Sequence, residues 1–252
     1  MKHALALYAA AAFAFLHLPL AVLAAFSFNR ARASVWEGFT LDWYTRAWAD
    51  TQLMEAAANS LFIAIFATAA ATVAGTLCAY ALWKRRSPIT TLTLSLTLVT
   101  PEIVLGISLL ALFQWLFQRL DLRLGMHTVI LAHISFCLSY VVIVVLARLR
   151  TMDPSLEEAA LDLGANEWQA FARVTLPNLV PGIVSAALLA FTISIDDYVI
   201  TSLVAGVDSE TLPMALYAMA RRGANPVVNA ISTVIVTGLG LLILVSERFR
   251  SR

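Results

Sequence analysis

The sequence predicts an all-α integral membrane protein with six transmembrane helices. Three observations support this: composition, the length of the apolar segments and the distribution of basic residues. Of 252 residues, 60% are apolar and 13% are charged, whereas soluble domains have about 45–50% and about 25%. A helix of about 20 apolar residues crosses a bilayer core about 30 Å thick. Six segments approach or exceed this length: 4–28, 58–83, 90–117, 127–147, 178–195 or slightly beyond, and 227–246.

The first segment also has features of a secretory signal, because a basic N-terminus precedes it and a possible Ala31-x-Ala33 cleavage site follows. We favour a retained helix, since the apolar stretch is longer than the roughly 7–15 residues of a usual signal core. The next part, 29–55, is too polar to span a membrane. We interpret it as an outer loop with a surface helix around 42–50.

The second segment is uncharged, whereas the third contains Glu102 directly after Pro101. Proline removes a backbone donor and bends helices. A carboxylate at helix-centre depth costs about 2.5–3.5 kcal/mol, so it is by default a functional candidate. Glu102, together with Asp196 and Asp197 near the outer end of the fifth segment, is therefore a candidate for a substrate path. The alternatives are a polar partner in a neighbouring helix for Glu102 and an outer interface for the aspartates.

An even number of spans places both termini on one side of the membrane. The loops on that side carry more Lys and Arg than the others, which predicts cytoplasmic termini. We treat 1–252 as a single transmembrane domain. In the outer segment 212–222, Leu212, Leu216 and Met219 share one helical face. This predicts a surface helix, either a contact for a solute-binding protein or a plain interfacial helix.

The longest inner loop, 149–176, has the pattern of two short helices. The first helix begins either with Asp153 as the cap and Pro154 as its first residue or with a capping box between Ser155 and Glu158. Gly164 suits the left-handed position just after its end. Apolar residues share one face and acidic residues lie elsewhere; the apolar set is Leu156, Ala159, Ala160 and Leu163, and the acidic set is Glu157, Glu158 and Asp162.

The second helix of the loop is predicted over 167–173, with Asn166 as its cap, and Pro177 is predicted to start the fifth span. The whole loop then forms a helix–turn–helix elbow on the cytoplasmic side. Small residues on the first helix let another surface approach its backbone closely. A helix that docks onto a partner needs this property, whereas a solvated helix does not.

The elbow resembles the EAA loop of binding-protein-dependent ABC importer permeases. The matching pattern is Glu158-Ala159-Ala160, three residues, Gly164, nine residues and Val174-Thr175-Leu176-Pro177, with Val174 where the family usually has isoleucine. The resemblance implies the type I, MetI-like fold and a coupling helix that seats in a groove of a cytoplasmic ATPase. It implies a docking surface formed by Glu158, Ala159, Ala160, Leu163 and Gly164. It also implies that Leu176 and Pro177 join the elbow to the span that moves.

Further motifs resemble the second permease subunit of spermidine/putrescine importers. They are Ser27-Phe28-Asn29, Trp36-x-Gly38-Phe39-Thr40, Trp43-Tyr44, Pro101-Glu102-Ile103-Val104, His133-Ile134-Ser135-Phe136-Cys137, Phe191-Thr192-x-Ser194-x-Asp196-Asp197, Thr211-Leu212-Pro213 and Asn225-Pro226-x-x-Asn229-Ala230. The resemblance implies half of a translocation pathway for a small cationic solute, a polyamine such as spermidine or putrescine. Alternatives are the same role for an aminoalkylphosphonate, an opine or a betaine, and, in another class, a secondary transporter or structural membrane subunit.

The implied partners are a second permease subunit in a heterodimer, two ATPase subunits, a periplasmic or surface solute-binding protein, and lipid, in a bacterial inner membrane. The only lysines are Lys2 and Lys84, and neither follows a glycine, so the chain has no P-loop and ATP and Mg²⁺ belong to the partner ATPases. We expect no enzyme activity, no cofactor and no metal in this chain, since neither ligand spacing nor a carboxylate–His–Ser arrangement is evident. Dispersed basic residues argue against nucleic acid.

Overall fold

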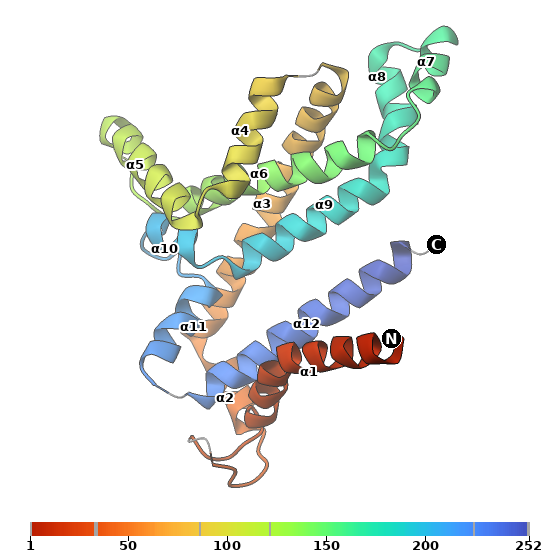
Figure 1. The fold of residues 1–252 in the computed structure, drawn as a ribbon. Coiled ribbons are helices and arrows are strands. Elements are labelled where there is room, and N and C mark those ends of the chain that lie inside the picture. The colour runs from red at the N-terminus through yellow and green to blue at the C-terminus, as the bar shows by residue number, and fades with distance from the viewer. Residues whose placement is uncertain (1, 33–34, 86, 121, 224, 251–252) are drawn as a thin grey trace. The chain divides into compact units, whose positions relative to one another are not determined.

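The computed structural model describes residues 2–32, 35–85, 87–120, 122–223 and 225–250, and these are almost entirely helical (Figure 1). The helices are α1 (Lys2–Phe26), α2 (Asp42–Ala49), α3 (Thr51–Lys84), α4 (Pro88–Val99), α5 (Glu102–Leu120), α6 (Met126–Leu149), α7 (Ser155–Asp162), α8 (Glu167–Ala170), the π-helical turn η1 (Phe171–Thr175), α9 (Leu176–Asp196), α10 (Val199–Val204), α11 (Leu212–Arg221) and α12 (Pro226–Arg250). The predicted all-α class is confirmed.

The chain forms two compact units, residues 1–57 with 214–252, and 58–213. In the first unit, α12 packs against α1 and α2. The loop after α1 folds around the buried Asn29, whose side chain donates to the Val35 carbonyl at 2.7 Å and accepts from the Glu37 amide at 2.9 Å. The Trp43 indole donates to the Asn29 carbonyl at 2.7 Å, which fixes α2 to this loop. Helix α2 confirms the surface helix predicted at 42–50; Ala33 of the possible cleavage site lies outside the described residues.

Helix α6 is the centre of the second unit. It is buried along most of its length and packs against α9, α10 and α4 (Figure 1). Two glycines allow neighbouring helices to approach α6 closely. A Cβ on Gly75 of α3 would lie 2.6 Å from Val141 of α6, and one on Gly182 of α9 would lie 2.8 Å from the Arg148 side chain. Small residues at these crossings let the backbones approach, as in other membrane bundles.

Five helices of the described residues are long and apolar enough to cross a membrane: Leu5–Phe26, Thr51–Lys84, Glu102–Arg119, Met126–Leu149 and Glu167–Asp196. Shorter apolar stretches are Pro88–Val99 and, within α12, Pro226–Gly238. The predicted helix at 212–222 is confirmed as α11. The sidedness of the termini stays a prediction.

The single helix predicted over 90–117 is wrong, because the segment is divided between α4 and α5. Thr100 is extended, with φ −67° and ψ 128°, and Pro101 follows it. Proline disfavours the helical conformation of the residue before it and has no N–H for the helical ladder. The signal for a bend was therefore correct, but the chain breaks here instead of bending.

The second correction concerns the end of the elbow. The helix expected to stop before Pro177 continues without a break from Glu167 through η1 into α9. Pro177 lies in the first turn of α9, where the missing N–H of proline is tolerated. The irregularity at this position is the π-helical turn at Phe171–Thr175, which widens the helix.

Candidate functional site

The first helix of the elbow, α7, begins and ends as local sequence chemistry predicts. Asp153 Oδ1 accepts the Ser155 amide at 3.0 Å, as the predicted cap at Asp153 requires, although α7 begins at Ser155, one residue after the predicted Pro154. Hydrogen bonds from Ser155 hold the pKa of Asp153 below its ordinary value. At the other end Gly164 has φ +88°. The Gly164 and Ala165 amides donate to the Leu161 and Ala160 carbonyls, at 2.9 and 3.0 Å, in a Schellman motif.

The second helix of the elbow is capped as predicted. Asn166 Oδ1 accepts the Gln169 amide at 2.8 Å, and Gln169 Oε1 accepts the Asn166 amide at 3.1 Å. This reciprocal pair is a capping box. The two caps and Gly164 together set the direction of the chain between α7 and α8.

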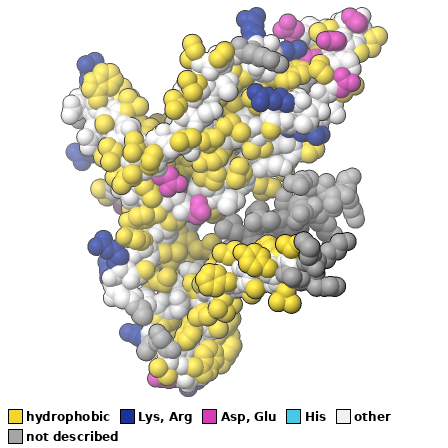
Figure 2. Space-filling model, in the orientation of Figure 1, with side chains coloured by type: hydrophobic (Ala, Val, Ile, Leu, Met, Phe, Trp, Pro, Cys, Tyr) yellow, Lys and Arg dark blue, Asp and Glu magenta, His cyan; other side chains and the backbone are white. Residues whose placement is uncertain are grey.

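The face of α7 that carries the predicted docking residues is open. Leu163 is 89% exposed, Leu156, Glu158 and Ala159 are exposed, and Ala160 is half-buried. Figure 2 shows acidic side chains gathered over the α7 end of the molecule. An exposed apolar stripe flanked by acids on a short helix has the composition of a protein contact surface.

Glu157 is the residue of the elbow whose surroundings the sequence does not reveal. It lies away from the apolar face, as predicted, and it is 3% exposed and the only buried residue of α7. Its carboxylate pairs with Lys84, accepts the Tyr80 hydroxyl at 2.7 Å and accepts the Thr175 hydroxyl at 3.0 Å. The sequence gives one indication that Glu157 has a buried ionic partner: Lys84, one of only two lysines, stands at the end of an apolar segment.

The Glu157 carboxyl is held in its charged form. Burial of the carboxyl favours the neutral form. Hydrogen bonds from Lys84, Tyr80 and Thr175, together with the charge of Lys84, outweigh burial and hold the pKa of Glu157 below its ordinary value. An ionised carboxylate is stable in a buried position only when its lone pairs are satisfied in this way.

Aromatic rings surround the Glu157 contacts. The Tyr80 and Phe171 ring centroids are 4.5 Å apart, Trp168 lies 5.5 Å from Phe171, and the Lys84 ammonium lies 5.3 Å from the centre of the Trp83 ring. The end of α3, the helix α7 and the turn η1 therefore meet in one cluster. The predicted joint residues, Leu176 and Pro177, follow directly after it.

Two of the three candidate path acids are exposed and lie at helix ends. Glu102 occupies the first turn of α5, where a helix N-terminus favours a negative charge, and Asp196 is the last residue of α9. Both are exposed, and the charge of Asp197 and, to a smaller extent, that of Glu102 act on Asp196 repulsively. Neither forms an ion pair with a residue that the structure describes.

Asp197 differs from these two acids, because its carboxylate is turned into the bundle and is 5% exposed. It accepts the Ile200 amide at 3.3 Å and the Thr201 amide and hydroxyl at 2.8 and 2.7 Å, which caps α10. Its Oδ2 also lies 3.5 Å from Nε2 of His133. These contacts favour a structural role for Asp197.

His133 of α6 links three elements. Its Nδ1 lies 2.7 Å from Ser194 Oγ of α9, and its Nε2 lies 2.9 Å from Thr201 Oγ1 of α10. Because Thr201 gives its only hydroxyl proton to Asp197, it accepts the proton that Nε2 carries. The structure thus corrects the expectation that no carboxylate–His–Ser set exists. Both Ser194 and His133 are buried, so this set has no access for a substrate and holds the helices together.

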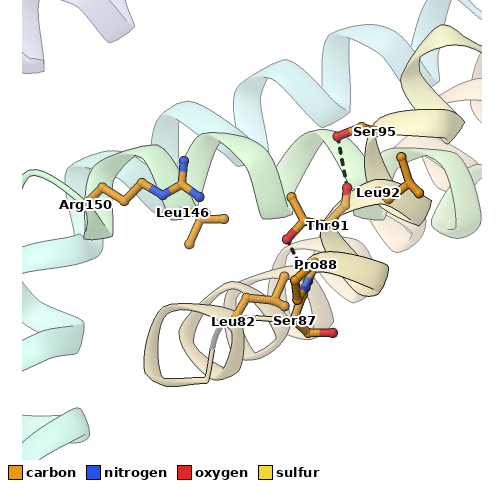
Figure 3. A pocket seen from close by; sticks show the side chains of 8 residues that line it. All are labelled: Leu82, Ser87, Pro88, Thr91, Leu92, Ser95, Leu146 and Arg150. Carbon is orange, nitrogen blue, oxygen red and sulfur yellow. Dashed lines mark hydrogen bonds between the residues drawn. The ribbon is translucent and has the colours of Figure 1, made fainter.

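A cavity of about 480 Å³ lies between the end of α3, α4 and α6 (Figure 3). Among the residues that the structure describes, Arg150 is the one charged residue that lines it. The Thr91 and Ser95 hydroxyls donate to backbone carbonyls of α4 and its cap, at 3.0 and 2.9 Å, so they offer little to a ligand. None of the predicted site residues lines it.

The apolar helices and the exposed α7 elbow are those of a multi-pass membrane protein with a surface suited to docking a partner. The chain belongs to the family of binding-protein-dependent transport system inner membrane components, whose model matches residues 71–250. This match confirms the predicted class and places the chain in the inner membrane.

The chain is 40% identical to the putrescine transport system permease protein PotI of Escherichia coli K12 over 237 residues, covering 91% of this chain and 84% of the relative. It is 39% identical to the spermidine/putrescine permease protein PotC of Haemophilus influenzae, covering 92% and 91%, and 37% identical to that of E. coli K12, covering 96% and 91%. The resemblance to polyamine-type permeases is thereby confirmed.

Two solved structures share the fold. One is a bacterial ABC transporter for import of the acidic polysaccharide alginate, with a TM-score of 0.72 and 16% identity over 99% of this chain and 95% of that chain. The other is an amino acid ABC transporter, with a TM-score of 0.60 and 17% identity over 83% and 99%. The ABC importer permease fold is confirmed. The family consists of transport components, and its members named here belong to multi-subunit transport systems.

Proposed function

We propose that this chain is the permease subunit of an ATP-driven importer for a polyamine such as putrescine or spermidine. Relatives that are 37–40% identical over more than nine-tenths of the chain are named as putrescine or spermidine/putrescine permease proteins. The proposal extends their substrate class to this chain. It also assigns to the chain one half of a translocation pathway that a second permease completes.

The observation that carries the polyamine proposal is the exposed pair Glu102 and Asp196. Two exposed carboxylates on a membrane helix bundle that have no cationic partner among the described residues are costly where water does not hydrate them. A solute with two or more ammonium groups offers each carboxylate an opposite charge. A neutral or zwitterionic solute neutralises at most one of them.

The energy for transport comes from other subunits in this proposal. Two ATPase subunits bind ATP and Mg²⁺, and the exposed face of α7 seats on one of them. A solute-binding protein delivers the cargo on the opposite side. Closure of the ATPase pair then moves α7, and the two permeases rock to open the pathway alternately to each side.

Uptake by the complete complex in proteoliposomes tests the proposal. Wild-type complex should accumulate labelled putrescine only with internal ATP and the binding protein. We expect Glu102→Gln and Asp196→Asn each to lower uptake about tenfold, which corresponds to about 1.4 kcal/mol. Glu55→Gln, an exposed acid outside the pair, is the matched control and should leave uptake unchanged.

Several results contradict the proposal. Uptake driven by a proton gradient without ATP would identify a secondary transporter. Calorimetry in which the binding protein takes an aminoalkylphosphonate, an opine or a betaine and no polyamine would assign another solute to the same machinery. Undiminished putrescine uptake in both carboxylate variants would remove Glu102 and Asp196 from the path.

A further inference from the structure

The attachment of α7 to its own chain has an unusual composition. Its apolar residues Leu156 and Leu163 face outward, and the single buried residue is Glu157. A short amphipathic helix normally buries its apolar stripe and exposes its charges. In α7 the apolar stripe is exposed, and one acid, Glu157, is buried instead. The buried side of α7 is therefore held by the ionic and hydrogen-bond contacts of Glu157, and its apolar stripe stays available to a partner.

The contacts of Glu157 join three elements. Oε1 pairs with the Lys84 ammonium and accepts a hydrogen bond from the Tyr80 hydroxyl; these two residues lie one turn apart at the end of α3. Oε2 accepts a hydrogen bond from Thr175, the last residue of η1. Charge-assisted hydrogen bonds have fixed directions and lengths, whereas apolar surfaces slide past one another. A carboxylate bound on both oxygens therefore fixes α7 relative to both neighbours.

The turn η1 is the irregular part of the long helix from Glu167 to Asp196. π-Helical turns are rare and occur often at functional sites. Both ends of η1 contact the cluster, since Phe171 packs 4.5 Å from the Tyr80 ring and Thr175 donates to Glu157. The contacts with α3 and α7 thus converge on the one place where the long helix departs from regular geometry.

We propose that Glu157 is a positioning residue that latches α7 to the end of α3 and to η1, so that displacement of α7 moves α3 and α9 together. This inference rests on the proposed function, because it assumes that α7 receives its displacement from an ATPase. Loss of the latch leaves the outer face of α7 intact for docking but lets α7 move without its neighbours. Such a complex hydrolyses ATP without moving solute.

The reconstituted complex tests this through the number of ATP molecules hydrolysed per putrescine imported. Glu157→Gln and Lys84→Met should raise this ratio about fivefold or more, while the ATPase subunits still copurify. Lys84→Arg keeps the ion pair and should preserve the wild-type ratio. Asp162→Asn, an exposed acid on the same helix, is the matched control.

A distance measurement that needs no transport separates the latch from the substrate proposal. Spin labels at Leu163→Cys and Arg85→Cys, with Cys78 and Cys137 replaced by serine, report α7 relative to α3. We expect a narrow distribution with Glu157 and a distribution at least twice as wide with Glu157→Gln or Lys84→Met. If the wild-type complex took up no putrescine, the proposed substrate would be wrong. The label distances would still test the latch, because they are measured without transport.

Two outcomes overturn the latch. The first is that Glu157→Gln and Lys84→Met both behave like the wild type, with the same number of ATP molecules hydrolysed per putrescine and the same distribution of label distances. The other is loss of the ATPase subunits from the Lys84→Met complex, because the half-exposed Lys84 would then belong to the ATPase interface. Since Lys84→Met leaves Glu157 accessible to Tyr80 and Thr175, the variant tests the ion pair even where Glu157→Gln fails to fold.

Discussion

Replacing His133 by alanine tests the network that fixes α6 to α9 and α10. His133 is 1% exposed, and its ring is bonded to Ser194 and Thr201. Each buried polar group that loses its partner costs about 1–3 kcal/mol. Thr201 still donates to Asp197 after the change, so only its acceptor side is lost, whereas Ser194 loses this bond outright. We therefore expect His133→Ala to lower the free energy of unfolding by about 2–4 kcal/mol.

Denaturant unfolding of the purified complex in detergent measures this effect, and a double-mutant cycle with Ser194→Ala isolates the bond between the two residues. We expect a coupling energy of about 1 kcal/mol or more. His127→Ala is the control, because His127 is exposed on the same helix; its effect should stay within about 0.5 kcal/mol. Equal effects of the two histidine changes, or strict additivity with Ser194→Ala, would refute the network.

Three further predictions follow from the backbone and from charge. Gly206→Ala should destabilise the complex by about 1–3 kcal/mol or more, since its Cβ would lie 1.8 Å from the Leu124 carbonyl oxygen. Thermal unfolding measures this loss, and it should show none for the control Gly238→Ala, whose Cβ would meet no atom within 4 Å. Gly164→Ala should lower the stability by about 1–2 kcal/mol through backbone strain alone, because Gly164 has φ +88°. An unchanged midpoint of thermal unfolding would contradict this. Because the pKa of Glu157 is lowered on folding, its ionised form stabilises the fold above the ordinary value of 4.5, and this contribution is lost as the pH falls through the lowered pKa. The stability difference between wild type and Glu157→Gln should therefore be constant near neutral pH and shrink in acid, whereas a difference that grows in acid would reverse the sign of the argument.

The parts of the molecule that the sequence predicts correctly depend on contacts between near neighbours. The cap at Asp153, the left-handed Gly164 and the capping box of Asn166 with Gln169 each join residues at most three positions apart or fix a single residue. Helical periodicity and segment length likewise indicate the bundle. Local chemistry therefore accounts for the two helices of the elbow and for the turn between them.

The parts that the sequence does not predict depend on partners distant in the chain. Glu157 meets Tyr80 across 77 positions, and His133 meets Ser194 across 61. No periodicity within α6 or α7 encodes these pairs. The break at Thr100 is intermediate, because Pro101 signals a disturbance but whether a helix bends or stops there depends on how α4 and α5 pack.

Cross-linking at α7 tests the central claim that this elbow transmits force from a separate motor. A photoreactive residue at Leu163, which is 89% exposed, should form an adduct with the ATPase subunit in the assembled complex, whereas the same group at the exposed Trp115 of α5 should not. An adduct at Trp115 with none at Leu163, or adducts at Leu163 with lipid alone, would contradict the account.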